Sequence, residues 1–219
     1  MVILTEAAAN PEAYDFTVLM GLADFIPVVL FAVSMVLLQR DLYNKMPKYA
    51  FACFAAGTIN VLMAGFMKAL WKTLYAAGVC DFQVLNKMFL PVNSLGFLLA
   101  GLGIILMFPK RGKMETLSVV GPLTKYEGTM VFISMMVLGL GAICACLSIL
   151  AAKMKKKGLI VVFVLCFIAY MGMGYLGSRG DNSAAANWIE QGVNTLGMIL
   201  LLWGTLGLHK AGLREFELN

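Results

Sequence analysis

Ionisable side chains stand inside apolar stretches of this sequence, where charged groups are costly. Asp24, Lys68 and Glu190 each lie within or close to the end of an apolar run long enough to cross a lipid bilayer. A charge at the bilayer centre costs about 3 kcal/mol or more, and such residues commonly mark a solute or ion pathway. We expect Asp24 and Lys68 to form a charge pair or coupling site. The alternatives are an Asp24 that merely pairs with a lysine, and a Lys68 or Lys72 that extends to the lipid headgroups.

Polar amides form two stripes that extend this candidate site. Amides in lipid need partners, so both stripes must face protein or a water-filled cavity. We expect Asn93 and Asn194 to bind solute or line a pathway, with Glu190 and Gln191 at one mouth. The alternative is that the amides only join helices, at about 1 kcal/mol each. The candidate substrate-binding residues are Asn93, Asn194, Asp24, Lys68, Asn60, Asn86, Asn187, Glu190 and Gln191.

Pro27 follows Asp24 closely and alters the backbone around it. Proline has no N–H, so the carbonyl of Ala23 loses its helical donor. A carbonyl freed inside a membrane must find another partner. We therefore expect the first helix to be loosened near Asp24.

Few residues of the chain could support catalysis. His209 is the only histidine, and four of the five cysteines lie inside apolar runs. We therefore expect no metal site, haem site, catalytic triad or redox motif, and no cofactor. An intramembrane enzyme acting on a lipid is a further alternative, and it requires Asp24 and Glu190 to converge. Arg179 and Asp181 are interpreted as part of a solvated turn.

The elements that must position these residues follow from composition. The chain has 219 residues, of which 61% are hydrophobic and 13% charged, whereas soluble proteins are roughly half apolar and a quarter charged. We predict an all-α integral membrane protein with six transmembrane helices, in a prokaryotic cell membrane. The net charge of +5 comes from clusters between apolar runs, which indicates topology signals rather than nucleic-acid binding. The predicted spans are 16–38, 49–75, 88–108, 129–152, 159–177 and 188–208.

An internal repeat divides the chain into two three-helix halves. Residues 86–96 align without gaps with residues 187–197, and two asparagines seven residues apart match in this alignment. A weaker match relates residues 64–66 to residues 173–175. The predicted organisation is a polar N-terminal tail (1–15), a first repeat (16–108), a polar linker (109–127), a second repeat (128–208) and a polar C-terminal tail (209–219).

The odd number of spans in each half predicts inverted halves, provided that the linker stays on one side of the membrane. The lysines of residues 153–157 would then face away from Arg40, Lys45 and Lys48, which cancels the usual cytoplasmic bias of positive charge. In the alternative these cations share one side, and residues 114–127 cross or re-enter the membrane. A helix of that length reaches only about 21 Å. We expect the inverted arrangement.

One segment resembles a known transporter family. Residues 93–99, Asn-Ser-Leu-Gly-Phe-Leu-Leu, follow a helix that ends near Trp71, and together they resemble the triple-helix-bundle sugar transporters of the PQ-loop kind. Those proteins also duplicate a three-span unit. They place an extra span between the halves and usually carry a Pro-Gln pair in the first helix, where this chain has Pro27-Val28. In size and span count the chain is also similar to the vitamin-binding subunits of energy-coupling importers. Neither resemblance assigns a residue.

These features favour one function and leave a second open. We expect a multi-pass transporter or channel for a small polar or anionic solute, with the binding site between the two repeats. The alternative is a non-transporting membrane binding subunit, sensor or scaffold that acts with a partner protein. The expected partners are the lipid bilayer and a small-molecule solute, with no nucleic acid, and homo-oligomer formation is left open.

Overall fold

Helices make up the computed structural model, which describes residues 14–108, 129–178 and 183–217. No strand occurs among these described residues. Within the described ranges, six helical segments are long and apolar enough to cross a membrane, which confirms the prediction of an all-α, multi-pass chain. The helices are α1 (Val18–Ala23) and α2 (Phe25–Leu42), which share the first span, followed after a 3-10 turn η1 (Tyr43–Lys45) by α3 (Lys48–Ala76), α4 (Gln83–Ile105), α5 (Thr129–Lys153), α6 (Lys157–Ser178) and α7 (Ala184–Lys210).

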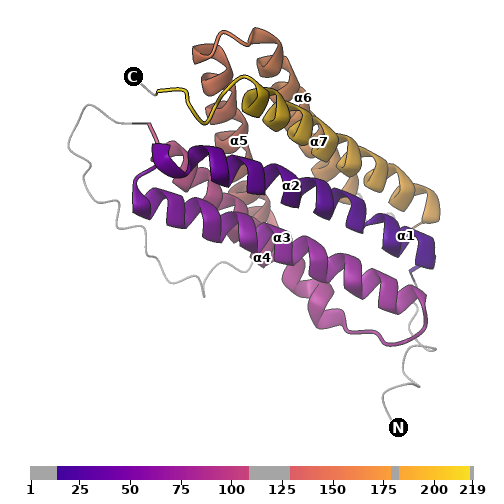
Figure 1. Ribbon diagram of the computed structural model, residues 1–219. Coiled ribbons are helices and arrows are strands. Elements are labelled where there is room, and N and C mark those ends of the chain that lie inside the picture. Colours follow the sequence, from indigo (N-terminus) through magenta and orange to yellow (C-terminus); the bar gives the residue numbers. More distant parts are fainter. Residues whose placement is uncertain (1–13, 109–128, 179–182, 218–219) are drawn as a thin grey trace.

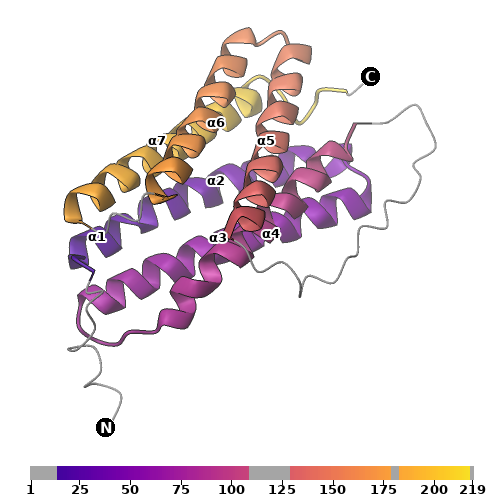
Figure 2. The same cartoon turned by 180° about the vertical axis from the view of Figure 1, so that it is seen from behind.

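The long helices form a closed bundle in chain order. Each packs against the next, and α7 returns to pack on α2 (Figures 1 and 2). Contacts at both ends fix the relative direction of α2 and α7. Gln191, early in α7, bonds to Ala23 at the start of the first span, whereas His209, late in α7, bonds to Asp41 near the end of α2. These two helices are therefore parallel.

The helices α3 and α6 run against all the others. Three of these helix pairs are antiparallel because a residue late in one helix contacts a residue early in the other. The fourth pair is antiparallel because its connection is very short. Residues 154–156 alone join α5 to α6, so that pair is antiparallel. The remaining antiparallel pairs are shown by Gln39 with Thr58 for α2 and α3, Gly103 with Phe54 for α4 and α3, and Gly204 with Phe163 for α7 and α6.

The two three-helix halves consequently run in the same sense, and the expectation of inverted halves is wrong. That expectation assumed a linker confined to one side of the membrane. Residues 114–127, whose crossing was left open, lie outside the described residues. Same-sense halves gather most of the cations at one end of the bundle, hereafter the basic end. Its cations in the described part of the chain are Arg40, Lys45, Lys48, Lys153, Lys155, Lys156, Lys157, Lys210 and Arg214.

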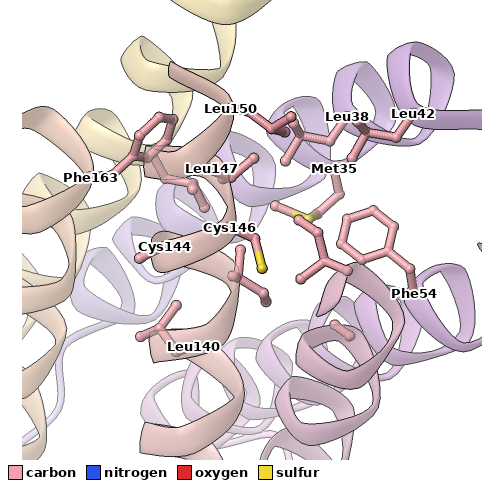
Figure 3. Packing of buried hydrophobic residues seen from close by; sticks show 14 of the residues in the cluster. Met35, Leu38, Leu42, Phe54, Leu140, Cys144, Cys146, Leu147, Leu150 and Phe163 are labelled. Carbon is pink, nitrogen blue, oxygen red and sulfur yellow. The ribbon is translucent and has the colours of Figure 1, made fainter. Parts of the chain in front are cut away.

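Apolar side chains fill the centre of the bundle. Figure 3 shows Met35 and Leu38 of α2 and Phe54 of α3 beside Leu147 of α5. Closer to the middle, the ring of Phe97 on α4 lies 6.3 Å from that of Phe31 on α2 and 6.2 Å from that of Tyr170 on α6, measured between centroids. Van der Waals packing of this kind is the main force that associates helices in lipid. Helices of both halves therefore meet in one packed core.

Candidate functional site

The first span is interrupted at Asp24, between α1 and α2. The break lies just before Pro27, which cannot donate to the carbonyl of Ala23. Gln191 of α7 takes that role, because its Nε2 donates to the Ala23 carbonyl at 2.7 Å. The structure thus places a predicted site residue on the carbonyl that the proline frees.

Asp24 forms its direct ion pair with Lys72 of α3. The Lys72 ammonium lies 3.1 Å from the Asp24 carboxylate, and the two side chains are only 7% and 13% exposed. Lys72 also lies over the ring of Phe16, 4.7 Å from its centroid. The alternative in which Lys72 extends to the lipid headgroups is wrong, because its side chain is buried and is directed toward the helix break. Each charge of the pair compensates the other at a depth where a lone charge would cost several kcal/mol.

Lys68 is the second cation of this region, one turn before Lys72 on α3. Its ammonium lies 4.3 Å from the centroid of the Phe89 ring on α4. It interacts electrostatically with Asp24 and Glu190, but no described carboxylate lies within 4 Å of it. The predicted direct pair of Asp24 with Lys68 is therefore replaced by the pair with Lys72. Lys68 retains an ammonium that could bind an anion.

The start of α7 supplies Glu190 and Gln191. The Ser183 hydroxyl caps this helix by accepting from the backbone N–H of Ala186 at 3.2 Å. Asn187 donates its Nδ2 to the Ser183 carbonyl at 2.9 Å, so this amide supports the helix start. Two turns into the helix, Glu190 and Gln191 reach the region of the helix break. Asp24, Lys68, Lys72, Glu190 and Gln191 are called the polar network below.

The two matched asparagines do not bond to each other. Asn93 is 6% exposed and donates its Nδ2 to the sulfur of Met136 on α5 at 3.3 Å. Asn194 is half-buried on α7, one turn further from Gln191, and α7 packs on α2 and α6 rather than on α4. Asn60 on α3 and Asn86 on α4 are also half-buried. Among the candidate residues, the structure brings the charged ones and Gln191 together. Asn60 lies on α3, Asn93 bonds to Met136 on α5, and Asn187 supports the start of α7.

Aromatic rings lie beside the Asp24–Lys72 pair, at the end of the bundle opposite the basic end. Tyr14, Phe16, Trp71 and Tyr75 form one cluster, with ring centroids 5.0 to 6.1 Å apart. Trp71 is 2% exposed and donates its indole N–H to Asp81 at 2.9 Å. Phe16 joins this cluster to the Lys72 ammonium. The low exposure of Lys72 and Asp24 strengthens the attraction between their charges.

A second polar cluster lies at the basic end, and sequence reasoning missed it. Asp41 is 2% exposed, and its Oδ2 lies 2.8 Å from Nδ1 of His209. Arg40 completes the cluster, with Nε 3.4 Å from Asp41 Oδ1 and Nη2 3.0 Å from Nε2 of His209. Residues 39–48 lie between two predicted spans, where polar side chains are expected to face water. A single histidine does not indicate which acid it contacts. The only available signal was an acid three residues beyond the predicted span 16–38, and the structure places it in the last turn of α2.

Known proteins give no further guidance. No group of three histidine, cysteine, aspartate or glutamate side chains in the described ranges could hold a metal ion. No family model, curated protein or solved structure matches the chain. The functional assignment therefore depends on the geometry of the polar network.

Proposed function

We propose that this protein transports a small polar or anionic solute and that the polar network is its solute and coupling site. The observation that carries this assignment is Lys68, an intramembrane cation with an aromatic contact and no described carboxylate within 4 Å. Ionisable residues at such depth commonly mark solute pathways. A carboxylate or phosphate of the solute would supply the close anionic partner that no described residue gives Lys68.

The broken first span supports this assignment. Transporters commonly build their sites from discontinuous helices, whose ends offer unpaired backbone groups to a solute or ion. Here the break at Asp24 lies beside the pair with Lys72, and one freed carbonyl is held by Gln191. Loss of the ion pair would leave two uncompensated charges, and loss of the Gln191 contact would free a backbone carbonyl for a solute or ion. These groups are assigned to binding and coupling, not to catalysis.

We also propose that the two halves arose by duplication and are related by an axis along the membrane normal, as in some transporters. In each half a glycine of the third helix packs on a residue of the second helix, α4 on α3 in the first half and α7 on α6 in the second. Each glycine of α7 comes 101 residues after its counterpart in α4, and each contact residue of α6 comes 109 residues after its counterpart in α3. With the halves in the same sense, the cations of the basic end face the cytoplasm. The corresponding contacts are Gly96 with Val61 and Gly197 with Tyr170, and Gly103 with Phe54 and Gly204 with Phe163.

A second candidate is a membrane subunit that binds the same solute without transporting it. The rings of Phe31, Phe97 and Tyr170 fill the centre of the bundle, and Asn93 is engaged with a methionine sulfur. A closed core of this kind is also what a sensor or scaffold requires. The two candidates share the site and differ in whether solute crosses the membrane.

Uptake into proteoliposomes tests the assignment. A panel of labelled small carboxylates and phosphates should include one that wild-type protein accumulates, and Lys68→Gln should reduce its uptake more than tenfold. Lys87→Gln is the matched control, because Lys87 is exposed on the neighbouring helix α4. Solute binding that depends on Lys68 without any uptake would favour the second candidate. Wild-type uptake by Lys68→Gln would contradict the assignment of the site.

A further inference from the structure

We propose that the basic end binds the phosphate headgroup of an anionic membrane lipid. A depression of about 350 Å³ lies there between α2, α3 and the C-terminal segment. Arg40 and Arg214 contribute to its wall together with Asn44, and Val36 and Phe51 contribute apolar surface. The site is separate from the polar network and does not depend on the proposed function.

The depression has the amphipathic character of a phospholipid. Val36 lies one helical turn deeper in the membrane than Arg40 on the same helix, and Phe51 lies inside the first turn of α3. The ring of Tyr43 packs edge-on against that of Phe51, 5.0 Å between centroids. Two guanidinium groups thus stand at headgroup level above an apolar wall. A phosphate can bind the cations while its acyl chain covers the wall.

Arg40 is held ready for an anion. Its Nε and Nη2 contact Asp41 and His209, and Nη1 donates to no other described residue. Guanidinium groups bind phosphate through two parallel N–H bonds, and fixing the side chain in advance reduces the entropy lost on binding. The Asp41 carboxylate is buried and already engaged by both neighbours, so it does not repel an incoming phosphate strongly.

The second arginine is positioned by the C-terminal segment. Leu213 is fully buried, which anchors this segment against the bundle. Lys45 donates its ammonium to the carbonyls of Arg214 and Phe216, at 3.0 and 2.5 Å. The carbonyls therefore face Lys45, and the exposed side chain of Arg214 reaches the wall of the depression.

The apolar wall favours a lipid over a soluble phosphate. Val36 is 65% exposed and Tyr43 is 62% exposed, so both present surface to the surrounding lipid. A free phosphate would contact the arginines and leave this surface unused. Basic residues near an anionic leaflet contribute about 1 kcal/mol each, which corresponds to roughly fivefold in affinity.

Lipid titration of the full chain in a neutral detergent tests this site. Native mass spectrometry would compare phosphatidylglycerol with phosphatidylcholine, and thermal unfolding would compare phosphatidylglycerol with soluble glycerol 1-phosphate. We expect tighter binding of phosphatidylglycerol, about fivefold weaker binding in Arg214→Gln, and more than tenfold weaker binding in the double variant Arg40→Gln/Arg214→Gln. The control Lys156→Gln/Lys157→Gln removes two charges from the same end and should keep the preference.

Arg214→Gln is the decisive variant, because Arg40→Gln also removes the contacts to Asp41 and His209. Equal binding of the two lipids would overturn the proposal, and so would an equal loss in the lysine control. Stabilisation by glycerol 1-phosphate at the same concentration as by phosphatidylglycerol would overturn the assignment to a lipid.

Discussion

Replacing Lys72 with methionine should destabilise the protein strongly. The change removes the ammonium that lies 3.1 Å from the Asp24 carboxylate and leaves that carboxylate 13% exposed among apolar residues. Breaking a buried ion pair by removing one partner costs about 3–5 kcal/mol, because the remaining charge is uncompensated. Lys68 still attracts Asp24 from a greater distance, so we expect the lower end of this range, about 3 kcal/mol.

The double variant Asp24→Asn/Lys72→Met separates the pair from general packing. Removing both charges leaves no buried ion, and replacing an ion pair by neutral groups of similar size is often close to neutral. Asp24→Asn alone leaves Lys72 with the ring of Phe16 as its remaining partner among the described residues. The double variant should therefore be more stable than Lys72→Met, with a coupling energy of about 1–3 kcal/mol.

Reversible unfolding in lipid bilayers, followed with wild type, both single variants and the double variant, measures this coupling. Lys87→Met removes an exposed lysine at the same end of the bundle and should change stability by less than about 0.5 kcal/mol. If the two single losses simply add, the charges do not interact and the described pair does not contribute to the fold.

Two further substitutions test the contacts between helices. Gln191→Leu should cost about 1–3 kcal/mol, because the Ala23 carbonyl loses its donor inside the membrane; unchanged unfolding would show that this carbonyl finds another partner. Gly139→Leu should cost on the order of 3 kcal/mol, since even a methyl group there would overlap the backbone of Phe97. A methyl group at Gly174 would have no atom within 4 Å, so Gly174→Leu should change stability little. An equal loss of stability in both glycine variants would contradict the close approach of α4 and α5.

The helices could be predicted because each depends on the length of an apolar run. The predicted span 129–152 differs from α5 (Thr129–Lys153) by one residue, since charged residues end the run abruptly. The direction of the helices could not be predicted in this way. The direction of the second half depends on whether the segment between the halves crosses the membrane. The apolar pattern of that segment does not distinguish a crossing from a linker that stays on one side.

The sequence indicates which residues belong to the polar network, but not which of them contact each other. Asp24, Lys68, Glu190 and Gln191 stood out because polar residues are costly in lipid. The partner of Asp24 could not be chosen, since Lys68 and Lys72 are one turn apart on one helical face. Only the packing of α1 on α3, where a methyl group at Gly21 would overlap Thr73, brings Lys72 to the carboxylate.

Contacts between residues far apart in the sequence could not be predicted either, because they depend on how the helices pack. His209 and Asp41 are separated by 168 positions, and no periodicity links them. Their contact follows from the parallel packing of α2 and α7 along their whole length. A lone histidine in a single sequence contains no information about which acid it will meet.

Crosslinking between the first span and α7 tests the central claim most directly, because only same-sense halves bring residue 191 to the helix break. The five native cysteines would be replaced and a short bifunctional thiol reagent applied in membranes. We predict that the pair Ala23→Cys/Gln191→Cys crosslinks efficiently and that Arg40→Cys/Gln191→Cys does not. Crosslinking of the second pair without the first would place the start of α7 at the basic end, and would contradict both the arrangement of the halves and the polar network built on it.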